Sequence, residues 1–292
     1  MRAIQIDRHG GPEALTLREV PEPVAAPGTV LVRTVASSLN PVDWKTRAWD
    51  IGPAFPMTLG WDLAGIVISA GTSGYRPGDR VIAMSAQVAT GLGTWADLVA
   101  LPEGLLAPAP AATSLTEAAT LPLAGLTALQ ALARIRPARG DRLLVTGAAG
   151  GVGGLAVQLA RRSGAVVDGL VSTAAHVPEV RSLGAETVVH DPGMLESGVY
   201  HAVFDTAGAA VEHALAPGGR YVAISDDPLP DVPGAAKSYV QEDGRALAEL
   251  AALVDSGELR LRVAEHHPVH AVRHAHERFE RGGLLGKVVL TF

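Results

Sequence analysis

Short apolar runs with strand-like alternation dominate the first third of the chain. Proline and glycine interrupt them, as at Pro27-Gly28 and Pro77-Gly78, which is typical of turns between strands. The runs are Met1–Asp7, Leu15–Glu19, Thr29–Ala36, Leu63–Ser69, Arg80–Met84 and Ala96–Leu101. This pattern predicts an irregular, mostly β domain up to about residue 110.

After Pro108–Pro110 the pattern changes, and strand-like and helical stretches alternate. Ser114 and Glu117 form a capping-box sequence that predicts a helix, and Pro122 separates it from a second helix over about Gly125–Ile135. Strands are then predicted over residues 142–146, 165–171, 186–190, 200–205 and 219–225, and helices over 151–163, 176–183, 209–215 and 244–256. This alternation predicts an α/β fold with a doubly wound parallel sheet, covered on both faces.

The tail of the chain, residues 258–292, predicts a strand, a helix over about Val269–Gly282 and a last strand over Gly286–Phe292. We expect this segment to return to the first domain. The domains are therefore predicted as residues 1–112 with 258–292, and residues 113–257.

A glycine-rich turn between an apolar strand and an amphipathic helix is the most specific local signal. Small residues let such a turn tighten and approach a pyrophosphate, while the helix N-terminus offers unpaired N–H groups to the phosphates. The turn reads Gly147, Ala148, Ala149, Gly150, Gly151, Val152 and Gly153. It predicts a dinucleotide site, and the alternative is a purely structural turn.

Composition narrows the class of protein. The chain has 292 residues, 48% of them hydrophobic and 18% charged, and a formal net charge of −6, which favours two folded domains over disorder. No basic stripe predicts a nucleic-acid or membrane partner. The lack of cysteine excludes disulfides, a thiolate nucleophile and cysteine-based zinc sites. No signal-peptide or membrane-spanning pattern is present, so we expect a cytoplasmic protein.

Cofactor preference depends on the end of the second strand. NAD enzymes usually place an acid about 20 residues past the glycine turn, to hold the ribose diol. Here the segment contains Ser172, Thr173 and His176 instead, which favours NADPH, since nothing there repels a 2′-phosphate. Asp168 is the alternative ribose partner in a different register.

The chain resembles the zinc-free branch of the medium-chain dehydrogenase/reductases, the NADPH:quinone oxidoreductase and enoyl-reductase-like proteins. The motifs that carry the resemblance are Ser38–Lys45, Leu59–Gly65, Pro77–Val81, Leu121–Ala128, Gly147–Gly153, Pro217–Arg220 and Gly286–Leu290. The resemblance implies a GroES-like, mostly β domain and a Rossmann domain. Asn40 stands where zinc enzymes of the superfamily place a cysteine, and Trp61 stands where they place a histidine, so we expect no metal.

The resemblance also implies roles for single residues. Asn40 and Thr127 are expected at the nicotinamide end, although Asn40 is also typical of an Asx turn before proline. Lys45 is either a proton donor or a solvated surface residue, and the candidate catalytic residues are Asn40, Lys45 and Thr127. Trp44 and Trp61 either wall the acceptor pocket or belong to the core. The cofactor-binding candidates are Asn40, Thr127, Gly147, Ala148, Ala149, Gly150, Gly151, Val152, Gly153, Ser172, Thr173, His176, Thr206, Ala207, Ile224, Ser225 and Lys287.

A histidine-rich segment near the C-terminus is the rival site. His270, His274 and Glu277 share one face of the predicted helix and could hold a metal, but a solvated polar helix is the favoured interpretation.

The leading hypothesis is an NADPH-dependent, metal-independent reductase of an activated C=C bond or a quinone. A zinc-free carbonyl reductase or alcohol dehydrogenase, and a non-catalytic dinucleotide-binding protein, stay open as alternatives. A homodimer is expected from the resemblance.

Overall fold

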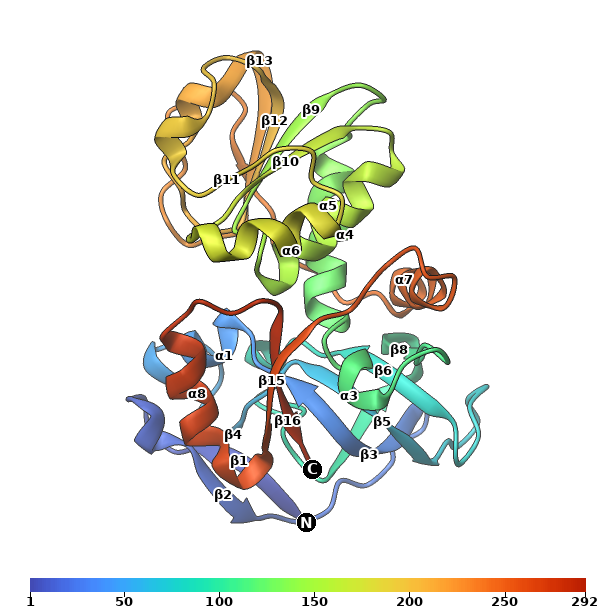
Figure 1. Cartoon of the computed structure of the whole chain (residues 1–292). Helices are drawn as coiled ribbons and strands as arrows, with labels where there is room; N and C mark the ends of the chain where they lie inside the picture. The colour runs from blue at the N-terminus through green and yellow to red at the C-terminus, as the bar shows by residue number, and fades with distance from the viewer.

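The first part of the chain and its last part together build a mostly β domain, the lower half of Figure 1, and the computed structural model describes all 292 residues. Its strands are β1 (Arg2–Ile6), β2 (Thr16–Glu19), β3 (Thr29–Ser38), β4 (Met57–Thr58), β5 (Asp62–Ser69), β6 (Arg80–Met84), β7 (Leu98–Pro102), β8 (Leu106–Pro108), β15 (Val263–Pro268) and β16 (Lys287–Thr291). Its helices are α1 (Pro41–Ala48), α2 (Gln87–Thr90), α3 (Leu115–Ala118) and α8 (Val272–Glu280). One sheet runs β2-β1-β4, and the larger runs β15-β16-β3-β5-β6-β8, with β7 paired to β3.

The C-terminal strand β16 pairs antiparallel with β3, with Val289 opposite Ser38. The chain thus returns to its first domain after crossing the second. This return places Lys287 beside the N-terminal residues that precede α1.

The second domain contains a six-stranded parallel sheet in the order β11-β10-β9-β12-β13-β14, the upper half of Figure 1. Its strands are β9 (Arg142–Thr146), β10 (Val166–Leu170), β11 (Val188–Val189), β12 (Tyr200–Asp205), β13 (Leu215–Ala223) and β14 (Ala236–Lys237). Its helices are α4 (Pro122–Ile135), α5 (Gly151–Arg162) and α6 (Val177–Ser182), while α7 (Gly244–Asp255) packs against both α4 and β8 of the first domain. The predicted combination of a Rossmann-type sheet and a GroES-like β domain is confirmed.

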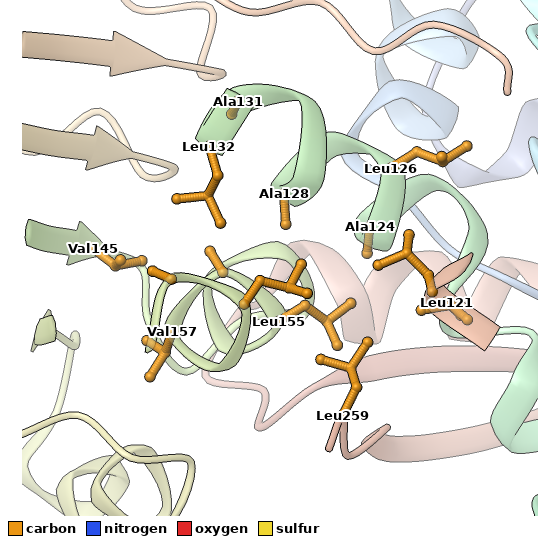
Figure 2. Close-up of a cluster of buried hydrophobic side chains, with 14 of the residues drawn as sticks. Leu121, Ala124, Leu126, Ala128, Ala131, Leu132, Val145, Leu155, Val157 and Leu259 are labelled. Atoms are coloured by element: carbon orange, nitrogen blue, oxygen red, sulfur yellow. The ribbon is translucent and has the colours of Figure 1, made fainter. Parts of the chain in front are cut away.

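The main core lies between this sheet and helices α4, α5 and α6, and continues through α7 to strands of the first domain. Figure 2 shows Ala128 and Leu132 of α4 directed toward Leu155 of α5, beside Val145 of β9. Short side chains at this contact let the two helices approach closely. The helix α4 begins at Pro122 rather than near Gly125, because proline lacks only an N–H that the first turn leaves unpaired.

The other face of the parallel sheet has its own apolar cluster, which non-helical segments cover. Leu195, Val211 and Ala214 pack there against strand residues such as Val203 and Tyr221. The predicted helix over residues 209–215 is wrong, since only a 3-10 turn forms at Glu212–Ala214 before β13 begins at Leu215. Gly208 has a φ of 69°, and too few residues remain after it for a helix before β13.

Candidate functional site

A cleft of about 520 Å³ lies between the two domains, along the carboxyl ends of the parallel strands. Ligands of open α/β sheets bind at this edge. The lining residues are Leu39, Asn40, Pro41, Gly147, Ala149, Gly150, Gly151, Val152, Gly153, Leu170, Val171, Ser172, His176, His190, Pro192, Thr206, Ala207, Ala209, Ile224, Phe279, Gly282, Gly283, Leu284, Gly286 and Lys287. Most of the predicted cofactor residues therefore converge on one cavity.

The glycine turn is held by its own backbone. Gly147 has a φ of 58°, and a Cβ at Gly153 would overlap the carbonyl oxygen of Gly147. Gly150 differs, because a Cβ there meets only Gly147 O, at 3.3 Å, and otherwise open space. A side chain at Gly150 would consequently enter the cleft, whereas one at Gly153 would disrupt the turn.

The first turn of α5 presents unpaired donors to the cleft. Gly150 N–H donates to Gly147 O, and Gly154 N–H donates to Gly150 O. The N–H groups of Val152 and Gly153 have no acceptor within the chain, whereas the N–H of Gly151 lies in a parallel bridge between Gly150 and Gly286. Two unpaired N–H groups at the positive end of a helix form a site for phosphate.

The far end of the cleft is polar and has no acidic lining. Ser172, His176 and His190 line it, and no aspartate or glutamate belongs to the cleft wall. His176 is 6% exposed, and its Nδ1 has no hydrogen-bond partner. Thr173 lies outside the wall, where its hydroxyl accepts a hydrogen bond from Ala175 N at 3.4 Å. The sequence analysis did not select His190, although it is the last residue of the predicted third strand.

Asp168, the alternative ribose partner, forms hydrogen bonds with other residues of the parallel-sheet domain. It is 2% exposed and accepts hydrogen bonds from Arg142 at 2.7 Å, Thr187 N at 2.9 Å and the Tyr200 hydroxyl at 3.0 Å. Its carboxylate is satisfied within the fold and does not line the cleft.

A buried polar network closes the opposite end of the cleft, and Asp62 is its centre. Oδ1 of Asp62 accepts from Leu123 N at 2.7 Å, and Oδ2 accepts from Asn40 Nδ2 at 2.8 Å and from the Ser38 hydroxyl. The Lys287 ammonium lies 3.6 Å from the same Oδ2. The carboxylate is fully buried, and these donors compensate for its lost hydration.

Asn40 and Lys287 line the cleft but direct their polar atoms into this network. Lys287 Nζ donates to Leu39 O at 2.7 Å and to Asn40 Oδ1. The amide of Asn40 donates to Asp62 and, at 3.3 Å, to Ser38 O. Both amide hydrogens of Asn40 thus have acceptors, so the arrangement leaves no hydrogen for the predicted bond to a carboxamide or acceptor oxygen.

Burial changes the protonation of the network. Asp43 is fully buried, and burial, reinforced by the neighbouring Asp62 carboxylate, raises the pKa of Asp43 to about 8. Its Oδ2 accepts from Asn40 N at 2.7 Å, which fixes the start of α1. Burial lowers the pKa of Lys287, although Asp62 and Asp43 oppose this effect.

Lys45 does not line the cleft. Its ammonium pairs with Asp226 and lies 5.8 and 5.9 Å from the ring centroids of Trp44 and Trp49. The pair connects α1 to the segment after β13. Lys45 is therefore a contact between the two domains rather than a free donor.

Other predicted site residues are also used by the fold. Thr127 donates its hydroxyl to Leu123 O at 2.7 Å within α4, and Trp61 belongs to the main core with its Nε1 unpaired. Ala148 is buried beneath the turn, and the Ser225 carbonyl accepts from Lys237. None of these four candidates lines the cleft.

The apolar wall comes from residues that the sequence analysis missed. Phe279 and Leu284, at the end of α8 and the loop before β16, line the cleft where Trp44 and Trp61 were expected. The sequence held only an indirect indication of this role. Residues 258–292 are predicted to return to the first domain, and Phe279 and Leu284 shortly precede the cofactor-binding candidate Lys287.

The histidines of the histidine-rich segment contact neighbouring carboxylates instead of forming a metal cluster. His267 contacts Glu265 at 3.3 Å, and His274 lies 3.9 Å from Glu277. No group of three His, Cys, Asp or Glu side chains is placed to hold a metal ion. No helix combines the length and the apolar character that a membrane crossing needs.

Comparison with known proteins places this geometry in a family. The model of the alcohol dehydrogenase GroES-like domain matches residues 26–111, and that of the zinc-binding dehydrogenases matches residues 174–290. The NADPH-dependent alkenal/one oxidoreductase of Arabidopsis thaliana is 32% identical over 308 aligned positions, which cover 99% of this chain and 79% of the relative. The chain belongs to the medium-chain dehydrogenase/reductase superfamily and is quinone-oxidoreductase-like, as the sequence motifs predicted.

Two further relatives support this placement. The chloroplast envelope quinone oxidoreductase homolog of Arabidopsis thaliana is 38% identical over 202 residues, 65% of this chain and 60% of the relative. The match thus spans less than two thirds of that relative's length. The solved quinone oxidoreductase of Coxiella burnetii superposes with a TM-score of 0.87 at 29% identity, covering 100% of this chain and 99% of that structure.

Proposed function

We propose that this chain is an NADPH-dependent oxidoreductase that transfers hydride to an activated C=C bond or a quinone without a metal. The observation that carries the proposal is the cleft, where the glycine turn with the two unpaired N–H groups of Val152 and Gly153 faces residues of the first domain. Relatives named as a quinone oxidoreductase homolog and an alkenal/one oxidoreductase support the same reaction class.

The cleft residues fit a dinucleotide. Gly150 leaves open space where a Cβ would project, and the unpaired N–H groups of Val152 and Gly153 suit a diphosphate. His176, with its unpaired and buried Nδ1, lies beside Ser172 at the far end. Because no acid lines this end, a 2′-phosphate meets no repulsion, which supports NADPH over NADH.

When bound, the nicotinamide supplies the hydride. The chain's own residues would position the nicotinamide ring and stabilise the negative charge that develops on the acceptor. Lys287 is the only lysine lining the cleft, and its ammonium supplies positive charge at the end closed by Asn40 and Asp62. An acceptor that is already activated needs less polarisation than a plain ketone, for which a Lewis acid contributes several kcal/mol.

Replacement of Gly150 tests the cofactor site. Gly150→Val places a side chain in the cleft, so the Kd for NADPH should rise far more than the melting temperature falls. Gly153→Ala is the matched control, because its Cβ overlaps Gly147 O and should lower the melting temperature instead. Unchanged NADPH affinity in folded Gly150→Val would refute a dinucleotide site at this turn.

A substrate panel tests the reaction class. Enones and quinones should be reduced with NADPH faster than with NADH, and saturated ketones should react poorly. Efficient turnover of saturated ketones would favour a carbonyl reductase, and binding without turnover would favour a nucleotide-binding protein.

Metal independence has its own test. Extended treatment with a chelator should leave activity unchanged, and elemental analysis should find no stoichiometric zinc. Loss of activity that added zinc restores would contradict this. The homodimer and the cytoplasmic location stay predictions, and sizing by light scattering tests the first.

A further inference from the structure

A buried arginine lies directly behind the glycine turn, although no arginine lines the cleft itself. Arg262 precedes β15, in the segment where the chain returns to its first domain. Its guanidinium donates through Nη1 to Ala149 O at 3.0 Å and through Nη2 to Gly150 O at 2.7 Å. One side chain thus holds two successive carbonyls of the turn.

The same segment supports the turn through its backbone. Gly286 N–H donates to Ala149 O at 3.1 Å, and Lys287 N–H donates to the carbonyl of Arg262, also at 3.1 Å. Residues 262 and 286 therefore form a support for the turn that is built from the first domain.

These bonds determine where the turn directs its donors. In a trans peptide the C=O and N–H point in opposite directions. Because Gly150 O faces Arg262, the N–H of the same peptide, that of Gly151, points the opposite way, into the parallel bridge with Gly286. Arg262 and Gly286 consequently fix this peptide from two sides at the start of α5, where the next N–H groups, those of Val152 and Gly153, are unpaired.

The guanidinium also adds charge. Burial lowers the pKa of Arg262 to about 10, which leaves it protonated at neutral pH, and nearby Glu179 favours the charged form while Arg260 opposes it. The side chain of Lys287 lies against Gly151, but its ammonium donates to Leu39 O and Asn40 Oδ1. Arg262 is thus the cation that bonds the carbonyls of the glycine turn.

The space beside the guanidinium is too small for a ligand. A cavity of about 10 Å³ lies there, bounded by Gly151, Arg262 and Lys287 among others. This volume holds at most about one water molecule. The guanidinium therefore holds the carbonyls of the turn and does not line a second binding site.

We propose that Arg262 is a positioning residue for diphosphate recognition, which holds the Ala149 and Gly150 carbonyls so that the next N–H groups face the cleft, with a positive charge behind them. The inference rests on the proposed function as a dinucleotide enzyme. It assigns part of the diphosphate affinity to a residue outside the glycine motif and outside the Rossmann domain.

Arg262→Met removes both hydrogen bonds and the charge. Calorimetric titration with ADP-ribose should show a Kd at least tenfold higher, which corresponds to about 1.4 kcal/mol. NADPH and NADH should weaken by the same factor, so that their affinity ratio stays within twofold of the wild-type ratio. Arg260→Met is the matched control: Arg260 bonds Glu179 and Ser182 and not the turn, so its Kd values should not change.

Gly154→Ala separates positioning from stability. A Cβ at Gly154 would overlap the Arg262 guanidinium, so the alanine displaces this flexible group without removing its charge. Alanine is a better helix former than glycine, so the melting temperature should not fall for reasons of propensity. We expect the ADP-ribose Kd to rise at least threefold in this variant.

Wild-type ADP-ribose affinity in either folded variant overturns the inference. An equal loss in Arg260→Met, or a changed NADPH to NADH ratio in Arg262→Met, also overturns it, because either result indicates general distortion of the cleft. Wild-type protein that binds neither NADPH nor ADP-ribose overturns the proposed function itself, so the two failures are distinguishable.

Discussion

Acidification should destabilise this protein through one buried histidine, His276 of α8. The side chain is 1% exposed, its ring packs edge-on against Trp95 at 5.3 Å, and its Nε2 has no partner. Its Nδ1 lies 3.3 Å from the Arg47 guanidinium, which itself donates to Glu280 at 2.9 Å. A second positive charge at this position would be both desolvated and repelled.

The size of the effect follows from the pKa difference between the folded and unfolded states. Burial, with Arg47 adding repulsion, lowers the pKa of His276 to about 3. An unfolded histidine has a pKa of about 6.5, so the unfolded state takes up the proton first as the pH falls. The stability from neutral His276 is present above about pH 6.5 and is lost below it, and by about pH 5 the loss reaches about 2 kcal/mol.

Urea unfolding at about pH 7.5 and about pH 5 measures this loss, and the variant His276→Phe isolates it. Phenylalanine keeps a ring against Trp95 but cannot be protonated, so its free energy of unfolding should fall by about 2 kcal/mol less than that of the wild type over this range. His274→Gln is the control, since His274 is exposed and should not change the pH dependence. Equal losses in wild type and His276→Phe would refute the reasoning.

Two further predictions concern residues of α1, which follows the cleft residues Leu39 and Asn40. Asp43→Asn should become more stable relative to wild type as the pH rises from 6 to 9 in urea titrations, because the raised pKa of Asp43, about 8, makes ionisation of the buried carboxyl costly only in the wild type. A constant difference across this range would show that Asp43 does not titrate there. Lys45→Met should change kcat by less than about threefold, because the Lys45 ammonium pairs with Asp226 outside the cleft wall, whereas a proton donor contributes about 10²- to 10⁴-fold.

Sequence patterns within a few residues of each other correctly predicted the elements that depend on neighbouring residues alone. The strand before Gly147 and the helix after Gly150 follow from apolar periodicity and from glycine's freedom at positive φ, so the turn and the parallel sheet were predictable. The helix over residues 209–215 failed because periodicity does not report where the next strand begins. Phe279 and Leu284 were missed because the cleft wall depends on how α8 packs after the chain returns.

The hydrogen-bond and ion-pair partners of the side chains were the least predictable part of the site. Asn40, Lys45 and Thr127 carry chemistry that suits catalysis, but each has a polar partner within the fold. A sequence lists donors and acceptors without pairing them, and Lys287 lies 247 residues from its acceptor Asn40. Only the fold brings these residues together.

The same pairing gives a physical reason for the proposed metal independence that does not depend on the lack of cysteine. A metal ion needs free lone pairs, but both oxygens of the Asp62 carboxylate already accept hydrogen bonds. Oδ1 of Asp62 accepts from Leu123 N, and Oδ2 accepts from Ser38 and Asn40 with the Lys287 ammonium nearby. Binding a cation there would require breaking these bonds and placing it near a buried ammonium, a cost that rises steeply in a desolvated site.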